Sequence, residues 1–178
     1  MRLPADDDWL LIVDPQTIFA DPALSPWGSP MFAAAVPVMI DLAAAYGPER
    51  TIITRFVADP TLGGSWGPYY DDWPFAVVAD DDPLYAVVPG LAGAAGHTVT
   101  EPTFGKWGGW LRSILGTHPR MTLAGVSTDC CVLATALPAA DTGATIRIAA
   151  DACAGSTPEN HRKALELMAL FAPQITIA

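Results

Sequence analysis

One stretch of the sequence, residues 121–141, most restricts what the chain can fold into. It starts with a short apolar run, Met121–Ala124, which is typical of a buried strand. The turn and N-cap residue types of Gly125–Asp129 follow, and an Ala- and Leu-rich segment that begins at Cys130 predicts a helix. Because a buried strand leads through a tight turn into a helix, this stretch indicates an α/β fold.

The same alternation of apolar runs and helical segments continues along the chain. Further strands are predicted near residues 9–13, 50–57, 96–101, 144–150 and 175–177, and further helices near 32–46, 110–115 and 158–171. Residues 59–74 contain too many Gly and Pro for a regular element and are predicted to form a long loop. We therefore predict one domain over residues 1–178, a Rossmann-like three-layer α/β/α sandwich with an open, mostly parallel sheet of about six strands.

Composition narrows the possible partners. Hydrophobic residues make up 51% of the chain, which is typical of a globular protein, and the net charge is −10. Binding to nucleic acid or to an anionic membrane needs clustered Lys and Arg, so neither partner is expected. The acidic start of the chain is unlike a signal peptide and no apolar run has the length of a membrane span, so a cytoplasmic protein is expected. Three cysteines, two of them adjacent, do not form a disulfide framework.

Cys131 lies in the turn between the predicted strand and helix. The N–H groups of a first helical turn have no intrahelical partners, and the positive end of a helix favours a thiolate, with a pKa of roughly 3.5–7.5 at such positions. The same N–H groups could hold an oxyanion beside the sulfur. The alternative is an inert core cysteine, which is the common role of a lone cysteine in an apolar segment.

The segment Gly125–Ala136 resembles the nucleophile motif of the isochorismatase-like cysteine hydrolases, which include nicotinamidases and N-carbamoylsarcosine amidohydrolases. The resemblance places the nucleophile at Cys131 and not at Cys130. It implies a cis peptide bond between Val126 and Ser127, and an oxyanion hole formed by the backbone N–H groups of Ser127 and Cys131. It covers nearly the whole chain and implies the same α/β/α fold.

Two further motifs carry the resemblance. Residues 14–19, Asp-Pro-Gln-Thr-Ile-Phe, are similar to the family's opening Asp-x-Gln-x-x-Phe motif and imply that Asp14 is the catalytic acid. Lys106, between glycines and aromatic residues after the third predicted strand, matches the family's catalytic lysine. From the residues alone, Asp14 could instead cap the next loop, and Lys106 could be an exposed lysine.

Five residues are candidates for substrate binding: Phe19, Arg55, Trp66, Tyr69 and Trp107. Arg55 ends a predicted strand and could bind an anion or a carbonyl group, or form a structural salt bridge. The aromatic residues of the 59–74 segment could line a pocket, pack onto the sheet, or contact another subunit.

Neither a metal nor another cofactor is expected. Nicotinamidases resemble one another in an Asp-x-His cluster after the second strand that holds a metal, and the corresponding positions here are Phe56, Val57 and Ala58. The three histidines lie far apart in the sequence and have no ligand spacing.

The resemblance implies hydrolysis of an amide-like C–N bond in a small molecule. Asp14 would take the proton of Cys131, Lys106 would keep both groups ionised, and a thioester on Cys131 would then be hydrolysed. The alternatives are a vinyl-ether hydrolase of the isochorismatase type, whose members usually lack the cysteine, and a non-catalytic binding or scaffold protein of the same fold. Cys130 is expected to be a small core residue, with a redox role as the alternative. The family is usually dimeric or tetrameric, so a homodimer or homotetramer is expected.

Overall fold

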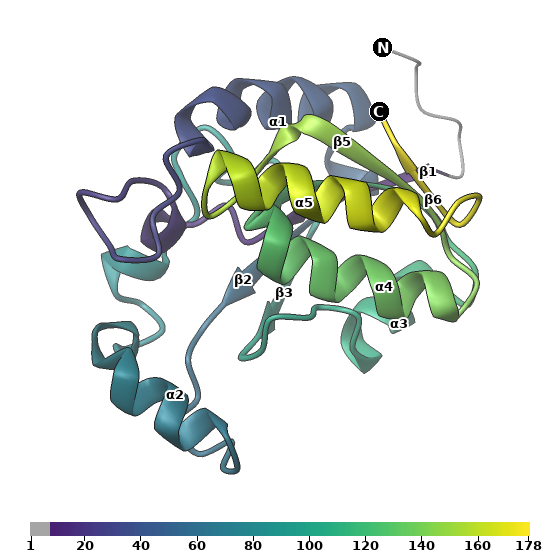
Figure 1. Cartoon of the computed structure of the whole chain (residues 1–178). Helices are drawn as coiled ribbons and strands as arrows, with labels where there is room; N and C mark the ends of the chain where they lie inside the picture. Colours follow the sequence, from purple (N-terminus) through teal and green to yellow (C-terminus); the bar gives the residue numbers. More distant parts are fainter. Residues whose placement is uncertain (1–7) are drawn as a thin grey trace.

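The strands form one parallel sheet in the computed structural model, which describes residues 8–178. The strand order is β3-β2-β1-β4-β5-β6, and every neighbouring pair is parallel (Figure 1). The strands are β1 (Asp8–Val13), β2 (Thr51–Phe56), β3 (His97–Glu101), β4 (Arg120–Val126), β5 (Thr145–Ala154) and β6 (Ile175–Ile177). The predicted α/β class and open parallel sheet are confirmed.

The direction in which the sheet grows reverses between β1 and β4. From this boundary β2 and β3 follow on one side, and β5 and β6 follow on the other. Open parallel sheets bind ligands at such a point, in the crevice outside the carboxyl ends of the strands. Asp14 follows β1 and Cys131 follows β4, so the sheet topology brings them to the same crevice.

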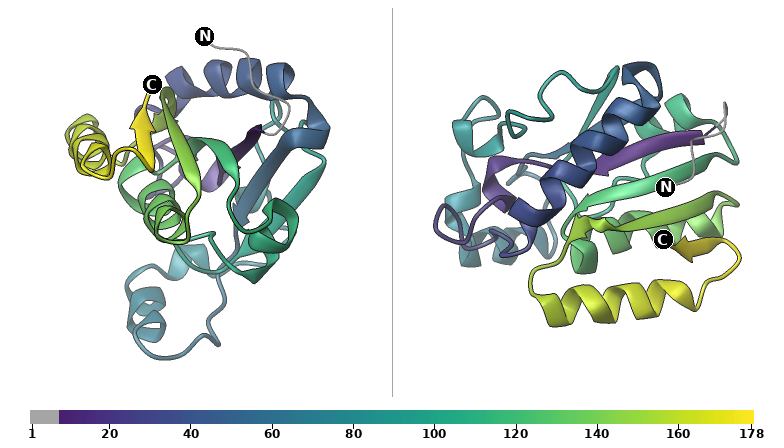
Figure 2. Two further views of the ribbon diagram at one scale, coloured as in Figure 1. Left: turned by 90° about the vertical axis from the view of Figure 1, so that its right-hand side faces the viewer. Right: turned by 90° about the horizontal axis from the view of Figure 1, so that it is seen from above.

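Helices cover both faces of the sheet (Figures 1 and 2). One face packs against α1 (Phe32–Tyr46), and the other packs against α3 (Gly109–Leu115), α4 (Leu133–Asp141) and α5 (Pro158–Ala169). Within β1, Leu10 and Ile12 belong to the core on the α1 side, whereas Leu11 and Val13 belong to the core on the opposite side. Both faces of this strand are buried, which explains its continuous apolar sequence.

The segment predicted to be a long loop contains a helix, α2 (Trp66–Asp72), so the prediction is wrong for these residues. The helix projects beyond the carboxyl end of β2 (Figure 1). Gly63 and Gly64 precede it with positive φ angles of 70° and 56°. Pro68 is compatible with the helix because it lies in the first turn, where no intrahelical partner for an N–H group is needed.

Near the carboxyl end of the sheet, the backbones of β1 and β4 approach each other closely at Gly125. β5 continues beyond its predicted end to Ala154, and its register against β4 shifts before Gly125 pairs with Cys153. Gly125 has φ 119°, and a Cβ atom there would lie 2.1 Å from the carbonyl oxygen of Val13. Only glycine fits this position, directly before the turn that carries Cys131.

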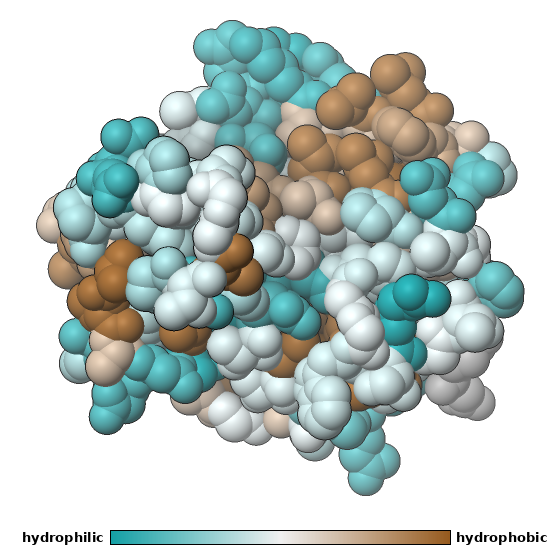
Figure 3. Space-filling model, turned by 90° about the horizontal axis from the view of Figure 1, so that it is seen from below, coloured by the Kyte–Doolittle hydropathy of each residue, from teal (hydrophilic) through white to brown (hydrophobic). Residues whose placement is uncertain are grey.

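Short helical turns complete the chain. They are the 3-10 turns Thr17–Phe19, Pro48–Arg50, Pro74–Ala76 and Pro83–Tyr85, and a π-helical turn, Thr128–Val132, that leads into α4. Within residues 8–178, no helix is long and apolar enough to cross a membrane. The face seen from below mixes hydrophilic and hydrophobic groups, and its hydrophobic residues lie in separate groups (Figure 3).

Candidate active site

Three side chains from distant parts of the sequence meet beyond the carboxyl ends of the central strands. Asp14 directly follows β1, Lys106 lies between β3 and α3, and Cys131 lies in the π-helical turn after β4. The ammonium nitrogen of Lys106 is 3.1 Å from Oδ2 of Asp14, and both side chains are completely buried. The Asp14 carboxylate raises the pKa of the Cys131 thiol and the Lys106 ammonium lowers it.

Thr54 positions the carboxylate of Asp14. Its hydroxyl donates to Oδ1 of Asp14 over 2.6 Å and accepts from the backbone N–H of Asp14 over 3.0 Å. Asp14 has a φ of 48°, which is uncommon for a residue other than glycine. Its Oδ2 atom makes the ion pair with Lys106 and has no donor of good hydrogen-bond geometry among residues 8–178, while the Asp14 side chain is near enough to the Cys131 thiol to raise its pKa through a hydrogen bond. This oxygen is therefore available to accept a proton.

Lys106 is held by backbone oxygens and an aromatic ring. Its ammonium donates to the carbonyl oxygens of Thr103, over 2.8 Å, and Glu101, over 3.3 Å. It also lies 5.4 Å from the ring centroid of Phe56. With three partners and the Asp14 carboxylate, the ammonium is fixed in one position despite its flexible side chain.

A hydroxyl group joins the lysine loop to the turn that carries the cysteine. The backbone N–H of Lys106 donates to Oγ1 of Thr135 over 2.9 Å, and the Thr135 hydroxyl donates to the carbonyl oxygen of Cys131 over 2.7 Å. Gly105 allows this approach, because a Cβ atom there would lie 2.8 Å from the carbonyl oxygen of Ala134. Neither Thr54 nor Thr135 was identified from the sequence, since their roles depend on contacts between distant segments.

The resting Cys131 side chain is a thiol. Burial and the nearby Asp14 carboxylate raise its pKa well above the ordinary value, and the opposing effect of Lys106 is smaller than the effect of burial. The sequence predicted a lowered pKa from the start of the helix. The side chain is only 4% exposed, and the loss of hydration outweighs the helix dipole.

The peptide bond between Val126 and Ser127 is cis, as the family resemblance implied. The carbonyl oxygen of Ser127 accepts hydrogen bonds from the backbone N–H groups of Cys130, over 3.0 Å, and Val132, over 3.1 Å. These bonds define the turn in which Cys131 lies.

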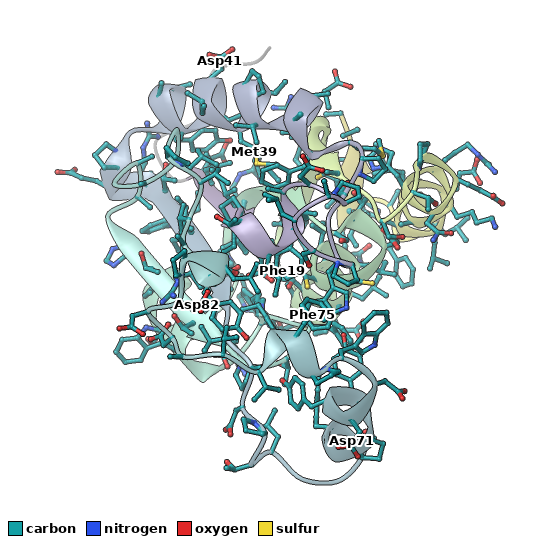
Figure 4. All side chains as sticks on the ribbon, turned by 90° about the vertical axis from the view of Figure 1, so that its left-hand side faces the viewer. Phe19, Met39, Asp41, Asp71, Phe75 and Asp82 are labelled. Carbon is teal, nitrogen blue, oxygen red and sulfur yellow. The ribbon has the colours of Figure 1, made fainter. Side chains whose placement is uncertain are left out.

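A cavity of about 330 Å³ opens beside Cys131. Half of its lining residues are aromatic. The lining comprises Phe19, Pro26, Trp27, Gly28, Phe56, Tyr69, Trp73, Phe104, Ser127, Cys130, Cys131 and Ser156. Trp27 packs against several of these rings: it stacks on Phe19 with centroids 6.2 Å apart, and on Tyr69 with centroids 5.8 Å apart. Phe19 and Phe75 lie between the sheet and α2 (Figure 4). They belong to a group of packed aromatic side chains, called here the aromatic group: Phe19, Trp27, Phe56, Trp66, Tyr69, Trp73, Phe75 and Phe104.

The predicted substrate-binding residues divide into two groups. Phe19 and Tyr69 line the cavity. Arg55 instead forms an ion pair with Asp80 over 2.7 Å, and Trp66 packs on Phe104 with ring centroids 5.2 Å apart.

Trp107 also has another partner, because its indole N–H donates to Oγ1 of Thr142 over 2.9 Å. Arg55, Trp66 and Trp107 are not among the residues that line the cavity. Trp73 also lines the cavity and lies in the 59–74 segment, whose aromatic residues were candidates for a pocket wall. Sequence reasoning missed Trp27, Phe56 and Phe104 as lining residues. The signal for Trp27 was an aromatic residue between Pro26 and Gly28 in a loop, which by itself does not tell a pocket wall from ordinary packing.

The side chains do not fit the metal site of nicotinamidases. The positions that the family resemblance assigned to its ligands hold Phe56, Val57 and Ala58, which carry no ligand atoms on their side chains. Within residues 8–178, no three His, Cys, Asp or Glu side chains are grouped so that they could hold a metal ion. The histidines have other partners: His118 meets the Thr142 carbonyl oxygen over 3.1 Å, and His97 packs against an indole ring.

A polar network lies behind the nucleophile turn. Ser156 donates its N–H and its hydroxyl to the two carboxylate oxygens of Asp129, over 2.8 and 2.6 Å. The Thr128 hydroxyl and Nδ1 of His161 are 2.8 Å apart. Burial lowers the pKa of His161, against the opposing effect of the carboxylates of Asp129 and Asp151.

Comparison with known proteins agrees with this architecture. The chain superimposes on a cysteine hydrolase from Pseudomonas syringae pv. phaseolicola 1448A with a TM-score of 0.80 and 19% identity, over 99% of this chain and 92% of that one. It also superimposes on a nicotinamidase from Bacillus subtilis, with a TM-score of 0.75 and 19% identity over 97% and 99% of the two chains. An isochorismatase family protein from Desulfovibrio vulgaris superimposes with a TM-score of 0.75 and 21% identity, over 96% of this chain and 93% of that one.

These structures share the fold at identities too low to transfer an activity. No curated protein sequence matches the chain. The family model described as the isochorismatase domain matches residues 8–178, nearly the whole sequence. The chain therefore belongs to the isochorismatase family of hydrolases.

Proposed function

We propose that the protein is a cysteine hydrolase that cleaves an amide-like C–N bond of a small molecule through a thioester on Cys131. The observation that carries the proposal is the buried ion pair of Asp14 and Lys106 beside the Cys131 thiol. A carboxylate oxygen without a donor of good hydrogen-bond geometry among residues 8–178, next to a thiol of raised pKa, is suited to take the thiol proton during the reaction.

In the first half of the reaction, Oδ2 of Asp14 accepts the proton as the Cys131 sulfur attacks the carbonyl carbon. The backbone N–H groups of Ser127 and Cys131 stabilise the oxyanion that forms. Asp14 then delivers the proton to the nitrogen, the C–N bond breaks, and an amine or ammonia leaves while the acyl group remains on the sulfur.

In the second half, a water molecule gives its proton to Asp14 and its oxygen attacks the thioester. The C–S bond breaks, the carboxylic acid is released, and the proton returns to the sulfur. Lys106 keeps its positive charge throughout. It stabilises the Asp14 carboxylate whenever Asp14 does not hold the transferred proton. The resting thiol means that the sulfur becomes a strong nucleophile only when the proton is transferred.

The test is a screen of small amides, ureas and carbamoyl compounds for release of ammonia. Cys131→Ala and Cys131→Ser are expected to abolish turnover, and Cys153→Ala, at a cysteine that does not line the cavity, is the matched control. Full activity of both Cys131 variants on a substrate that the native protein turns over would refute the thioester. Release of pyruvate from isochorismate would instead support the vinyl-ether reaction.

We further propose a homodimer or homotetramer. Large apolar side chains are exposed on separate elements, among them Trp110 on α3 at 66% and Leu170 after α5 at 78%. Burying such residues is a common feature of subunit interfaces. Sedimentation equilibrium at several concentrations tests this, and a monomer at every concentration contradicts it.

A further inference from the structure

No charged side chain lines the cavity beside Cys131: within residues 8–178 its lining contains no lysine, arginine, histidine, aspartate or glutamate. Six of its twelve lining residues are aromatic: Phe19, Trp27, Phe56, Tyr69, Trp73 and Phe104. The face of an aromatic ring carries the negative part of its quadrupole and attracts cations within about 6 Å.

The proposed catalytic groups add no net positive charge beside the cavity. Lys106 is completely buried outside the cavity lining, and its charge is matched by the Asp14 carboxylate at 3.1 Å. Cys131 is a neutral thiol in the resting protein because its pKa is raised. Neither group makes the cavity attractive to an anion.

A negative charge, the Asp129 carboxylate, lies directly behind the polar part of the cavity wall. Ser156 lines the cavity and donates its hydroxyl hydrogen to Oδ2 of Asp129 over 2.6 Å, while Asn160 donates to the same hydroxyl oxygen over 3.0 Å. The single hydrogen of this hydroxyl is therefore used, and Ser156 can only accept from a ligand. Because the Asp129 carboxylate accepts this hydrogen, it also increases the negative partial charge on the Ser156 hydroxyl oxygen.

We propose that the cavity selects amides that also carry an organic cation, such as a quaternary ammonium group or a protonated nitrogen heterocycle, and that it disfavours carboxylates. The aromatic rings surround the cation, and the Asp129–Ser156 pair supplies the negative potential. The amide part of this assignment rests on the proposed function, whereas the cation subsite does not. Hydrolysis consumes one water and converts the amide to a carboxylate and ammonia, so the product is a zwitterion that keeps the organic cation.

Matched probes that cannot be hydrolysed test the subsite. Choline, its neutral carbon isostere 3,3-dimethylbutan-1-ol, and the anion 3,3-dimethylbutanoate have similar shapes and differ in charge. Titration calorimetry with the full-length Cys131→Ala protein is expected to show choline binding about tenfold more tightly than the alcohol. The carboxylate is expected to bind most weakly. Equal affinities for choline and the alcohol, or tighter binding of the carboxylate, overturn the proposal.

Two substitutions locate the effect. Asp129→Asn is expected to lower the choline-to-alcohol preference by a few fold, whereas Asp41→Asn, which removes the same charge from the outer side of α1 (Figure 4), is expected to leave it unchanged. Trp73→Leu is expected to reduce the preference by removing one ring of the wall, and it avoids Trp27, which packs against several other rings. A preference that survives both Asp129→Asn and Trp73→Leu overturns the assignment of the subsite.

The two proposals fail in different ways. If the protein hydrolyses no amide, the binding preference among the three probes is unaffected. If the probes bind without preference for the cation while an amide is turned over, the hydrolase proposal stands and the cation subsite is wrong.

Discussion

The ammonium nitrogen of Lys106 lies 3.1 Å from Oδ2 of Asp14, and neither side chain has any contact with solvent. A buried ion pair depends on both partners, because either charge alone would lie in a medium that solvates it poorly. The pair therefore links the stability of the fold to the chemistry of the site, since the same two groups surround the Cys131 thiol.

Lys106→Met is expected to reduce the free energy of unfolding by about 3–5 kcal/mol, because it leaves the Asp14 carboxylate buried without its cation. Urea denaturation followed by circular dichroism measures this. The control is Lys163→Met, which breaks an exposed ion pair with Glu159, of 2.7 Å, and is expected to change stability by less than about 0.5 kcal/mol. Equal stabilities of the two variants contradict the importance of the buried pair.

Asp14→Asn is expected to reduce turnover of an identified amide substrate by about 10²- to 10⁴-fold, because the amide side chain cannot accept the thiol proton. The loss should appear in kcat, since Asp14 is not among the residues that line the cavity. Asp41→Asn serves as the charge control and is expected to retain full activity. Unchanged kcat in Asp14→Asn would mean that another group takes the proton.

Alkylation of Cys131 by iodoacetamide is expected to be slow at pH 7 and to rise about tenfold per pH unit up to pH 9, because only the thiolate reacts and its pKa is raised. The same electrostatics predict opposite effects of two substitutions. Asp14→Asn removes a charge that raises the pKa and should speed alkylation, whereas Lys106→Met removes a charge that lowers it and should slow alkylation. Mass spectrometry assigns the label to Cys131 or Cys130, and a rate independent of pH would exclude a raised pKa.

Thr54→Val is expected to lower kcat by about 10- to 100-fold, because it removes the hydroxyl that fixes Oδ1 of Asp14 while keeping the shape of the side chain. Thr54→Ser keeps the hydroxyl and is expected to retain most of the activity. Substrate affinity should be similar in all three proteins, because Thr54 is not among the residues that line the cavity. Equal losses in the valine and serine variants would indicate a packing effect and not a hydrogen-bonding one.

The stability of the fold is expected to fall in alkaline solution. Burial raises the pKa of Cys153 from 9.0 to about 12, so the folded protein keeps a proton that the unfolded chain loses. The stabilisation is complete below pH 9 and is lost as the pH rises toward 12. Between pH 8 and pH 10 this one group accounts for on the order of 1 kcal/mol.

Urea denaturation at pH 8 and pH 10 tests this contribution. Over this interval the free energy of unfolding of Cys153→Ala is expected to fall by on the order of 1 kcal/mol less than that of the native protein. Cys130, whose pKa is raised to about 11 by burial and by Asp129, contributes to the loss in both proteins equally. The same pH dependence in both proteins would show that Cys153 does not bind the extra proton.

Much of the fold follows from local patterns. The apolar run that forms β1 and the helix Phe32–Tyr46 lie where the sequence predicts them, because burial on both faces and a terminating Gly-Pro pair are local signals. The helix Trp66–Asp72 was missed because its glycines and proline resemble a loop, and only its packing against the rest of the aromatic group stabilises it.

The candidate site divides in the same way. The sequence by itself showed that Asp14, Lys106 and Cys131 each follow a predicted strand, so that a parallel sheet would bring them to one edge. The family resemblance, and not the strand pattern, made them the candidate catalytic residues. Only the tertiary structure decided the charge state of the thiol, the positioning by Thr54 and the aromatic wall around Trp27. The physical reason is that pKa values, hydrogen bonds and cavities depend on which side chains exclude water from one another, and these side chains are tens of residues apart in the sequence.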